Sequence, residues 1–140
     1  MRRQSLRVLL ALIGLVVIWL GLNVSLGGIT TLGWQGPTDF LTITDNDAFS
    51  VQDNHVRFIA GIWTSVGIFL MIGAIFLERL AAVLMVLMAM VFIGGLTRLT
   101  ALDAALLLSP KIAPSLFIEL FIFPLLGFWI YQTTQKNSHD

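Results

Sequence analysis

The sequence contains no cysteine, which excludes disulfide bonds, thiolate metal sites and thiol nucleophiles. It has 2 histidines, His55 and His139, too few for a histidine-rich metal or haem centre. Charge is also scarce, because charged residues make up 11% of the chain against about 25% in soluble domains. The net charge is zero and no basic run follows the N-terminus, so nucleic-acid binding is not supported.

Apolar residues are abundant instead. They make up 57% of the chain, and the mean hydropathy is +0.91. A single soluble core could not hide this much apolar surface, so we expect a lipid bilayer to cover it. The apolar runs predict four spans, at about 6–26, 56–77, 80–102 and 115–132. We therefore predict an all-α, antiparallel four-helix transmembrane bundle, with residues 1–140 as a single membrane domain.

One long outer loop is predicted over 27–54. Gly27-Gly28, Gly36-Pro37 and Asp45-Asn46-Asp47 are its turn and breaker signals. Two short β-prone runs, Ile29 to Leu32 and Phe40 to Ile43, lie inside it. Trp34 is expected to anchor the loop at the membrane interface.

The cationic residues predict the orientation, because cytoplasmic loops carry an excess of Lys and Arg. One side of the predicted topology holds Arg2, Arg3, Arg7, Arg79 and Lys136, and the loops of the other side hold only Lys111. We therefore expect both termini inside and the 27–54 loop outside. The small chain favours a bacterial inner (cytoplasmic) membrane, which would make that loop periplasmic.

Two arginines in the predicted spans lie at similar heights. Arg57 comes 21 residues before Glu78, and Arg98 comes 19 residues after Arg79. At about 1.5 Å per residue, both are roughly 30 Å from the same inner turn, level within about 3 Å. Glu119 enters the fourth span from the outer side by about one turn. The sequence thus predicts a polar layer just below the outer surface.

Charges at such positions need partners, since one at the centre of a span costs about 2.5–3.5 kcal/mol. Glu119 is the expected partner, because an arginine fork can grip a carboxylate with two hydrogen bonds. Asp53 and Asp103, at the mouths of helices, can neutralise the remaining charge, and His55 can cap or hydrogen-bond. The candidate layer comprises Arg57, Arg98, Glu119, Asn23, Asp53, Asn54, His55 and Asp103.

Small residues follow the same pattern. Gly61 lies one turn deeper than Arg57, and Gly94 lies one turn deeper than Arg98. We expect each glycine to let another backbone approach, or to leave room for an arginine stem or a ligand. In the first span, Gly14 and Gly21 share a helical face that another helix could approach closely.

These motifs also carry a resemblance. The run Asp53-Asn54-His55-Val56-Arg57-Phe58 followed by Gly61, the run Gly94-Gly95-Leu96-Thr97-Arg98-Leu99, and Glu119 in the last span resemble an uncharacterised family of small bacterial four-helix membrane proteins, a domain of unknown function. In layout the chain is also similar to the DoxX-like four-helix proteins. The resemblance implies the fold and the membrane location, and it implies no activity.

Three interpretations of Arg57, Arg98 and Glu119 stay open. The first is a buried ion-pair network that fixes the helix register. The second is an outward-facing site for a small anion or a lipid headgroup, and the third is a proton relay through Glu119. His55 with Asp53 has the spacing of no known metal site, so we predict no metal and no cofactor.

The sequence shows no catalytic constellation. We therefore expect a small non-enzymatic membrane protein that is an accessory or assembly subunit of a larger complex, or a homo-oligomer. Its expected partners are the lipid bilayer and either other membrane-protein subunits or copies of itself. The alternative is a binder or carrier of a small anionic or lipid-like molecule at the Arg57, Arg98 and Glu119 layer.

Overall fold

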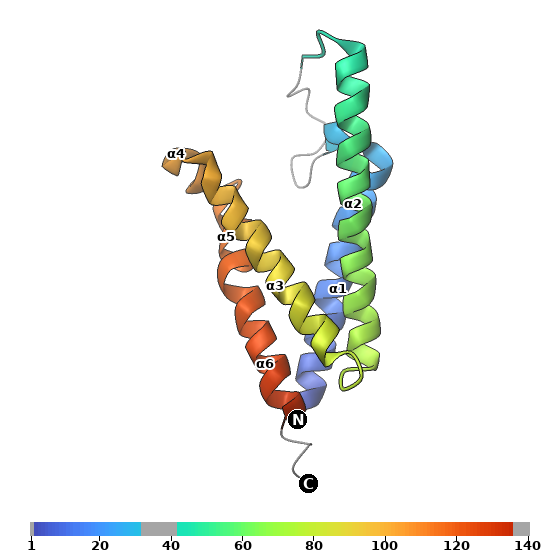
Figure 1. Cartoon of the computed structure of the whole chain (residues 1–140), viewed down its shortest axis with the longest axis vertical. Helices are drawn as coiled ribbons and strands as arrows, with labels where there is room; N and C mark the ends of the chain where they lie inside the picture. Colours follow the sequence, from blue (N-terminus) through green and yellow to red (C-terminus); the bar gives the residue numbers. More distant parts are fainter. Residues whose placement is uncertain (1, 32–41, 136–140) are drawn as a thin grey trace. The chain divides into compact units, whose positions relative to one another are not determined.

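The computed structural model describes residues 2–31 and 42–135, and this part contains helices and no β-strand (Figure 1). In chain order its elements are α1 (Arg2–Gly27), the 3-10 helix η1 (Ile29–Thr31), α2 (Asn46–Ile75), α3 (Ala81–Arg98), the 3-10 helix η3 (Leu99–Ala101), α4 (Ala104–Leu107), α5 (Ala113–Phe117), the π-helix η4 (Ile118–Ile122) and α6 (Phe123–Gln135). The predicted all-α class is confirmed for these residues.

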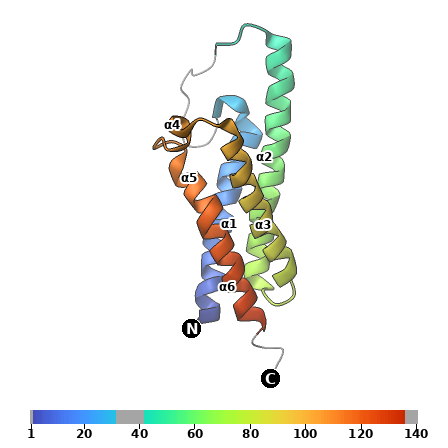
Figure 2. The ribbon, with the colours of Figure 1, turned by 60° about the vertical axis from the view of Figure 1, so that its left-hand side comes forward.

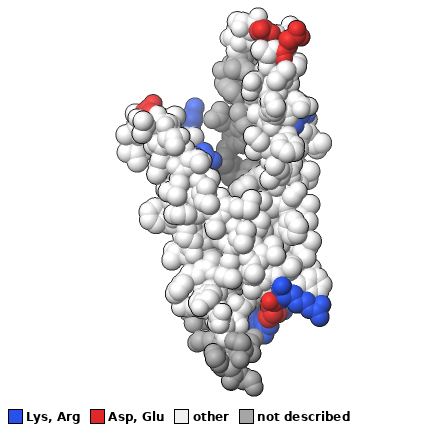
Figure 3. Space-filling view, in the orientation of Figure 1, with Lys and Arg blue, Asp and Glu red and all other residues white. Residues whose placement is uncertain are grey.

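Four helical segments are long and apolar enough to cross a membrane. They are Arg3–Gly27, Asn46–Ile75, Ala81–Ala101 and Ala113–Gln135. Large apolar side chains such as Leu12, Phe69 and Leu125 are exposed along them. On the face drawn in Figure 3, the charged side chains of the described residues gather at a few places. Because a surface of this kind needs lipid rather than water, the chain is a multi-pass membrane protein.

The chain divides into two compact units. One covers residues 8–74 and is called the α1–α2 unit here, and the other covers residues 1–7 and 75–140 and is called the α3–α6 unit. The predicted single domain and the antiparallel arrangement of all four spans concern both units together. They stay predictions.

Small residues bring α1 and α2 together in the α1–α2 unit. A Cβ atom on Gly14 would lie 2.9 Å from the carbonyl oxygen of Gly67, and a Cβ atom on Gly67 would lie 2.7 Å from the backbone nitrogen of Ile18. Further along, a Cβ atom on Gly21 would lie 2.7 Å from the backbone nitrogen of Thr64. Only glycine allows two helices to approach so closely. The predicted role of Gly14 and Gly21 is confirmed.

In the α3–α6 unit, α3 and α6 lie side by side in both ribbon views (Figures 1 and 2). Leu84, Met88 and Val91 are buried on α3, and Phe123, Leu126 and Ile130 are buried on α6. A Cβ atom on Gly127 would lie 3.3 Å from Cβ of Met88. The two helices therefore share an apolar core at helical spacing.

The start of α2 corrects a sequence prediction. The predicted span begins at about Val56, but the helix begins at Asn46. Asp45 caps it, because its Oδ1 accepts hydrogen bonds from the backbone nitrogens of Asp47 and Ala48, both at 3.0 Å. The run that we interpreted as a loop signal is thus a helix cap, and residues 46–54 belong to α2 and not to the outer loop.

The rest of the predicted loop is described in part. Ile29–Thr31 forms η1 rather than the expected β-prone run. Thr42 and Ile43 have no regular structure. Trp34 and the Gly36-Pro37 turn signal lie outside the described residues.

The fourth span is interrupted by η4. In this π-helix the backbone nitrogen of Phe123 donates to the carbonyl of Ile118, five residues earlier. Pro124 follows directly and has no N–H to offer, so the carbonyl of Leu120 loses its regular helical partner. A single wide turn accommodates this loss and keeps the helix continuous.

Candidate functional site

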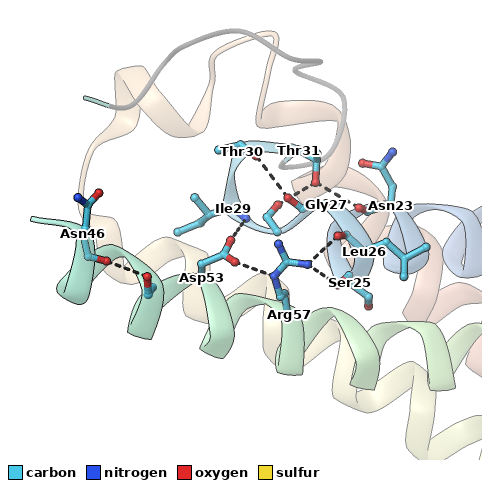
Figure 4. Close-up of polar contacts among 12 residues, drawn as sticks. Asn23, Ser25, Leu26, Gly27, Ile29, Thr30, Thr31, Asn46, Asp53 and Arg57 are labelled. Atoms are coloured by element: carbon cyan, nitrogen blue, oxygen red, sulfur yellow. Dashed lines mark hydrogen bonds and ion pairs between the residues drawn. The ribbon is translucent and has the colours of Figure 1, made fainter. Parts of the chain in front are cut away.

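Arg57 of α2 binds the end of α1 (Figure 4). Its Nη1 donates to the carbonyl oxygens of Leu26 at 2.6 Å and Ser25 at 3.2 Å. Its Nε donates to Oδ2 of Asp53, one turn earlier on α2, at 2.6 Å. The other carboxylate oxygen of Asp53 accepts a hydrogen bond from the backbone nitrogen of Ile29 at 2.6 Å. The Asp53–Arg57 pair therefore binds both the carbonyl groups at the end of α1 and the backbone amide of Ile29, which follows it.

Local geometry explains why this position suits a charged pair. The last carbonyls of an α-helix have no partner within the helix and carry partial negative charge. Gly28 ends α1 with φ +74°, and its nitrogen donates to the carbonyl of Val24 at 2.7 Å. The hydroxyl of Thr31 donates to the carbonyls of Asn23 at 3.2 Å and Gly28 at 2.8 Å. Arg57 supplies the remaining positive donors.

Gly28 leaves the space that Asp53 and Arg57 occupy. A Cβ atom at Gly28 would overlap Oδ1 of Asp53 and lie 2.6 Å from Nη2 of Arg57. The left-handed backbone of Gly28 also favours glycine. We call Gly28, Asp53, Arg57 and the carbonyls of Ser25 and Leu26 the α1 end site.

Three other predicted residues lie near this site. Asn23 contributes its backbone carbonyl to the Thr31 hydrogen bond (Figure 4). Asn54 and His55 are exposed on α2, and neither side chain makes a hydrogen bond or ion pair with the described part of the chain. The expected capping role of His55 is not found there.

Arg98 pairs with Glu119 in the α3–α6 unit. Its Nη2 donates to Oε1 at 2.9 Å, and its Nε lies 2.7 Å from Oε2. The Nε contact is an ion pair that falls outside hydrogen-bond geometry. The side chain of Glu119 is 14% exposed and that of Arg98 is 41% exposed. The predicted pairing of these two residues is present, with the acid as its more buried member.

Two elements place Glu119 against α3. Glu119 lies in the π-helix η4, and Gly95 of α3 faces it. A Cβ atom on Gly95 would lie 2.9 Å from Cβ of Glu119 and 3.0 Å from Cδ2 of Leu120. The neighbouring Gly94 would meet no atom within 4 Å. The close approach therefore depends on Gly95.

Two roles were predicted for Gly61 and Gly94, a close backbone approach or open room. A Cβ atom on Gly61 or on Gly94 would have no described atom within 4 Å. Open room is the alternative that fits both residues. The close contacts belong to Gly67 and Gly95 instead.

Asp103 acts as a helix cap. Its carboxylate accepts a hydrogen bond from the backbone nitrogen of Leu106 at 3.0 Å, at the start of α4. No ion pair joins it to Arg98 within the described residues. Its expected share in neutralising the arginines is thus not found.

The α1 end site and the Arg98–Glu119 pair belong to different units. A common layer of Arg57, Arg98, Glu119 and Asn23 stays a prediction. Across residues 2–31 and 42–135, no three His, Asp or Glu side chains are grouped as metal ligands.

An open apolar groove of about 360 Å³ lies between α3 and α6. Its lining includes Met85, Met88, Phe92, Pro124, Gly127 and Phe128. Pro124 and Gly127 present little side chain there. No charged residue lines the groove, and Tyr131 is the one lining residue with a polar group on its side chain.

Sequence reasoning missed the central part of the α1 end site, which is backbone. Two signals could have found it. Gly27-Gly28 after a long apolar run is a helix-end signal. Asp53 and Arg57 are spaced i,i+4, so their side chains lie on one helical face.

The family model for DUF4345, a domain of unknown function, matches residues 5–130. The chain belongs to the DUF4345 family. The match covers α1 through most of α6 and both arginine sites. No curated protein and no solved structure matches the chain.

Proposed function

We propose that this member of the DUF4345 family is a non-enzymatic protein of the bacterial inner membrane. It acts as an accessory or assembly subunit of a larger membrane complex, or as a homo-oligomer. In this proposal the four helices form an antiparallel bundle with both termini in the cytoplasm, and the segment between α1 and α2 faces the periplasm. The distribution of cationic residues supports that orientation.

The observation that carries the proposal is the length of α2. Its 30 residues correspond to about 45 Å, more than the roughly 30 Å of a hydrocarbon core. The end of α1 is fixed at the level of Asp53 and Arg57 by the contacts to Ile29 and Leu26. Residues 46–52, which we call the α2 arm, continue for about 10 Å beyond it.

The surface of the α2 arm suits a protein partner. Its side chains are exposed except for the half-buried Phe49, and Val51 is 54% exposed. Asp45 caps the arm by accepting two backbone hydrogen bonds, so the arm is helical up to its first residue. A rigid helix that presents apolar residues beyond the lipid offers an anchor for another protein.

The paired arginines support the same proposal. Arg57 has a carboxylate and two carbonyls as partners, and Arg98 has Glu119. Guanidinium groups with these partners hold helices in place and keep little charge for a ligand. The alternative, a carrier of a small anion at these residues, has less support for this reason.

Site-specific cross-linking tests the proposal. A photo-reactive phenylalanine analogue replaces Val51 in the arm, and in a control it replaces Val86 on α3, which is 59% exposed. In native membranes we expect a protein adduct from position 51 and lipid adducts from position 86. Mass spectrometry identifies the adduct as a second copy or as another membrane protein.

Native mass spectrometry of the unmodified protein in mild detergent completes the test. We expect an assembly heavier than the 15.4 kDa chain. Val51→Asp should shift that assembly toward the monomer, while Val86→Thr should leave it unchanged. A monomer throughout, with no adduct at position 51, would rule the proposal out.

A further inference from the structure

A cluster of basic side chains is formed by the start of α1 and the turn that precedes α3. Arg3 and Arg7 of α1 both pair with Glu78, which lies in the turn before α3. Arg79 is the next residue and is exposed. All four belong to the α3–α6 unit. Three cations against one carboxylate leave a net charge of 3 − 1 = +2.

Glu78 does not saturate these arginines. Each guanidinium carries five N–H donors, whereas one carboxylate offers only two oxygens. Nη2 of Arg7 reaches Oε2 of Glu78 at 3.2 Å, and Nε of Arg7 is buried, so the donors that a ligand can reach are those on the exposed part of the guanidinium group. The side chains of Arg3 and Arg7 are 45% and 39% exposed. The pairing holds them in place and leaves donors available.

The start of α1 adds positive potential of its own. The amide groups in the first turn of a helix have no partner within the helix, and the macrodipole is positive there. No acidic residue lies in the first turn of this 26-residue helix. Its electrostatic effect therefore adds to that of the arginines instead of cancelling it.

The position of the cluster along the chain indicates the occupant. Glu78 and Arg79 form the short polar break between two membrane-crossing segments, and the exposed apolar residues Ile75 and Phe76 lie three and two residues before Glu78. Guanidinium groups next to lipid-exposed apolar side chains face the phosphates of the bilayer surface. A molecule with a phosphate head and apolar tails matches both parts.

We propose that Arg3, Arg7 and Arg79 bind the phosphate of an anionic phospholipid, and that Glu78 positions Arg3 and Arg7 for this contact. The site is separate from Arg98 and Glu119, because the 18 residues of α3 lie between them. It is also independent of the proposed partner at the α2 arm.

Lipid retention in native mass spectrometry tests this site. The purified full chain is equilibrated with phosphatidylglycerol and phosphatidylcholine of the same acyl chains. We expect retention of phosphatidylglycerol in preference to phosphatidylcholine. Each arginine replaced by glutamine should lower that preference about fivefold, as expected for one basic residue near a charged surface.

The variants are chosen so that folding is preserved. Arg79→Gln removes an exposed cation, and Arg3→Gln with Arg79→Gln removes two while Arg7 stays paired with Glu78. Lys111→Gln is the matched control, since it removes an exposed cation from the loop before α5. It should leave lipid preference unchanged. An unchanged thermal midpoint for each variant shows that the fold is intact.

Three outcomes would overturn the proposal. Equal retention of both lipids by the unmodified chain would show that no anionic headgroup is selected. An equal loss in the Lys111→Gln control would show an effect of net charge alone. Displacement of phosphatidylglycerol by millimolar inorganic phosphate would assign the site to a soluble anion instead of a lipid.

Discussion

Arg57 and Arg98 are both paired, but with different kinds of group. Arg57 takes its carboxylate from its own helix and gives its other hydrogen bonds to backbone carbonyls. Arg98 takes its carboxylate from Glu119, on a segment reached through the three short helices η3, α4 and α5. Arg57 caps the carbonyl end of α1, whereas Arg98 forms an ion pair with the side chain of Glu119 on another segment. The same residue type thus has two separate structural tasks.

The difference extends to the glycine beside each arginine. Gly28 makes room for a charged pair at a chain reversal with a left-handed backbone. Gly95 makes room for the Cβ of Glu119 in a regular helix. A side chain at Gly28 would conflict with both the backbone conformation and the available space, whereas a side chain at Gly95 would conflict with the available space alone. Substitutions can therefore separate the two.

Gly28→Ala should have the largest effect. The added Cβ would overlap Asp53, and alanine disfavours the left-handed conformation, so we expect a loss of about 2–4 kcal/mol in the free energy of unfolding. Denaturation of the protein in mixed micelles measures it. Gly61→Ala, in open space within α2, is the control and should be neutral or stabilising by up to about 1 kcal/mol. Equal effects of both substitutions would contradict the role of the α1 end site.

The Arg98–Glu119 pair should respond asymmetrically. Arg98→Gln leaves a mostly buried carboxylate without its cation, and we expect a loss of about 2–3 kcal/mol in the free energy of unfolding. Glu119→Gln leaves an arginine that solvent reaches, and it should cost only about 1 kcal/mol. Unfolding of the two variants side by side gives the comparison.

A charge swap sharpens that result. In Arg98→Glu with Glu119→Arg the pair is restored with reversed sense, so we expect recovery of about half of the stability that Arg98→Gln loses. A swap as unstable as the worse single variant would show that the site requires each charge at its own position. That outcome would favour a ligand-binding role over a structural one.

The neighbouring glycines of α3 should differ from each other, and Gly94→Ala should have the smallest effect of all these substitutions. Gly95→Ala forces Glu119 and Leu120 outward and should cost about 1–2 kcal/mol of stability. Gly94→Ala meets no atom and should be neutral or slightly stabilising. Thermal unfolding of both variants checks this. If the two proved indistinguishable, the approach of η4 to α3 at Gly95 would not limit the stability of this unit.

Much of the fold could be predicted from hydropathy and spacing. The four spans follow from long apolar runs. The contact of Gly14 and Gly21 with another helix follows from their spacing of seven residues, which places both on one helical face. The start of α2 could not be predicted in the same way. Asp45 reads equally as a turn residue or a cap, and only the two amide hydrogen bonds decide between them.

The site was predictable where two side chains meet and not where a side chain meets backbone. Glu119 is an expected partner of Arg98, because a charged side chain in a membrane span is costly unless an opposite charge pairs with it. The partners of Arg57 include carbonyls of Ser25 and Leu26, which every residue type carries, so no sequence letter marks them. Asp103 was expected to neutralise an arginine, but it caps α4 because the free amides of a helix start lie closer to it.

The π-helix η4 restricts the length of this part of the chain. Its wide turn holds one residue more than an α-helix would, and Glu119 lies inside it. One further residue inserted between Glu119 and Pro124 would have no wide turn left to absorb it and would rotate Glu119 by about 100° relative to the buried face of α6. Arg98 would then lose its partner although no charge had changed. Across the family, we therefore expect single-residue insertions to be rarer between Glu119 and Pro124 than single-residue deletions.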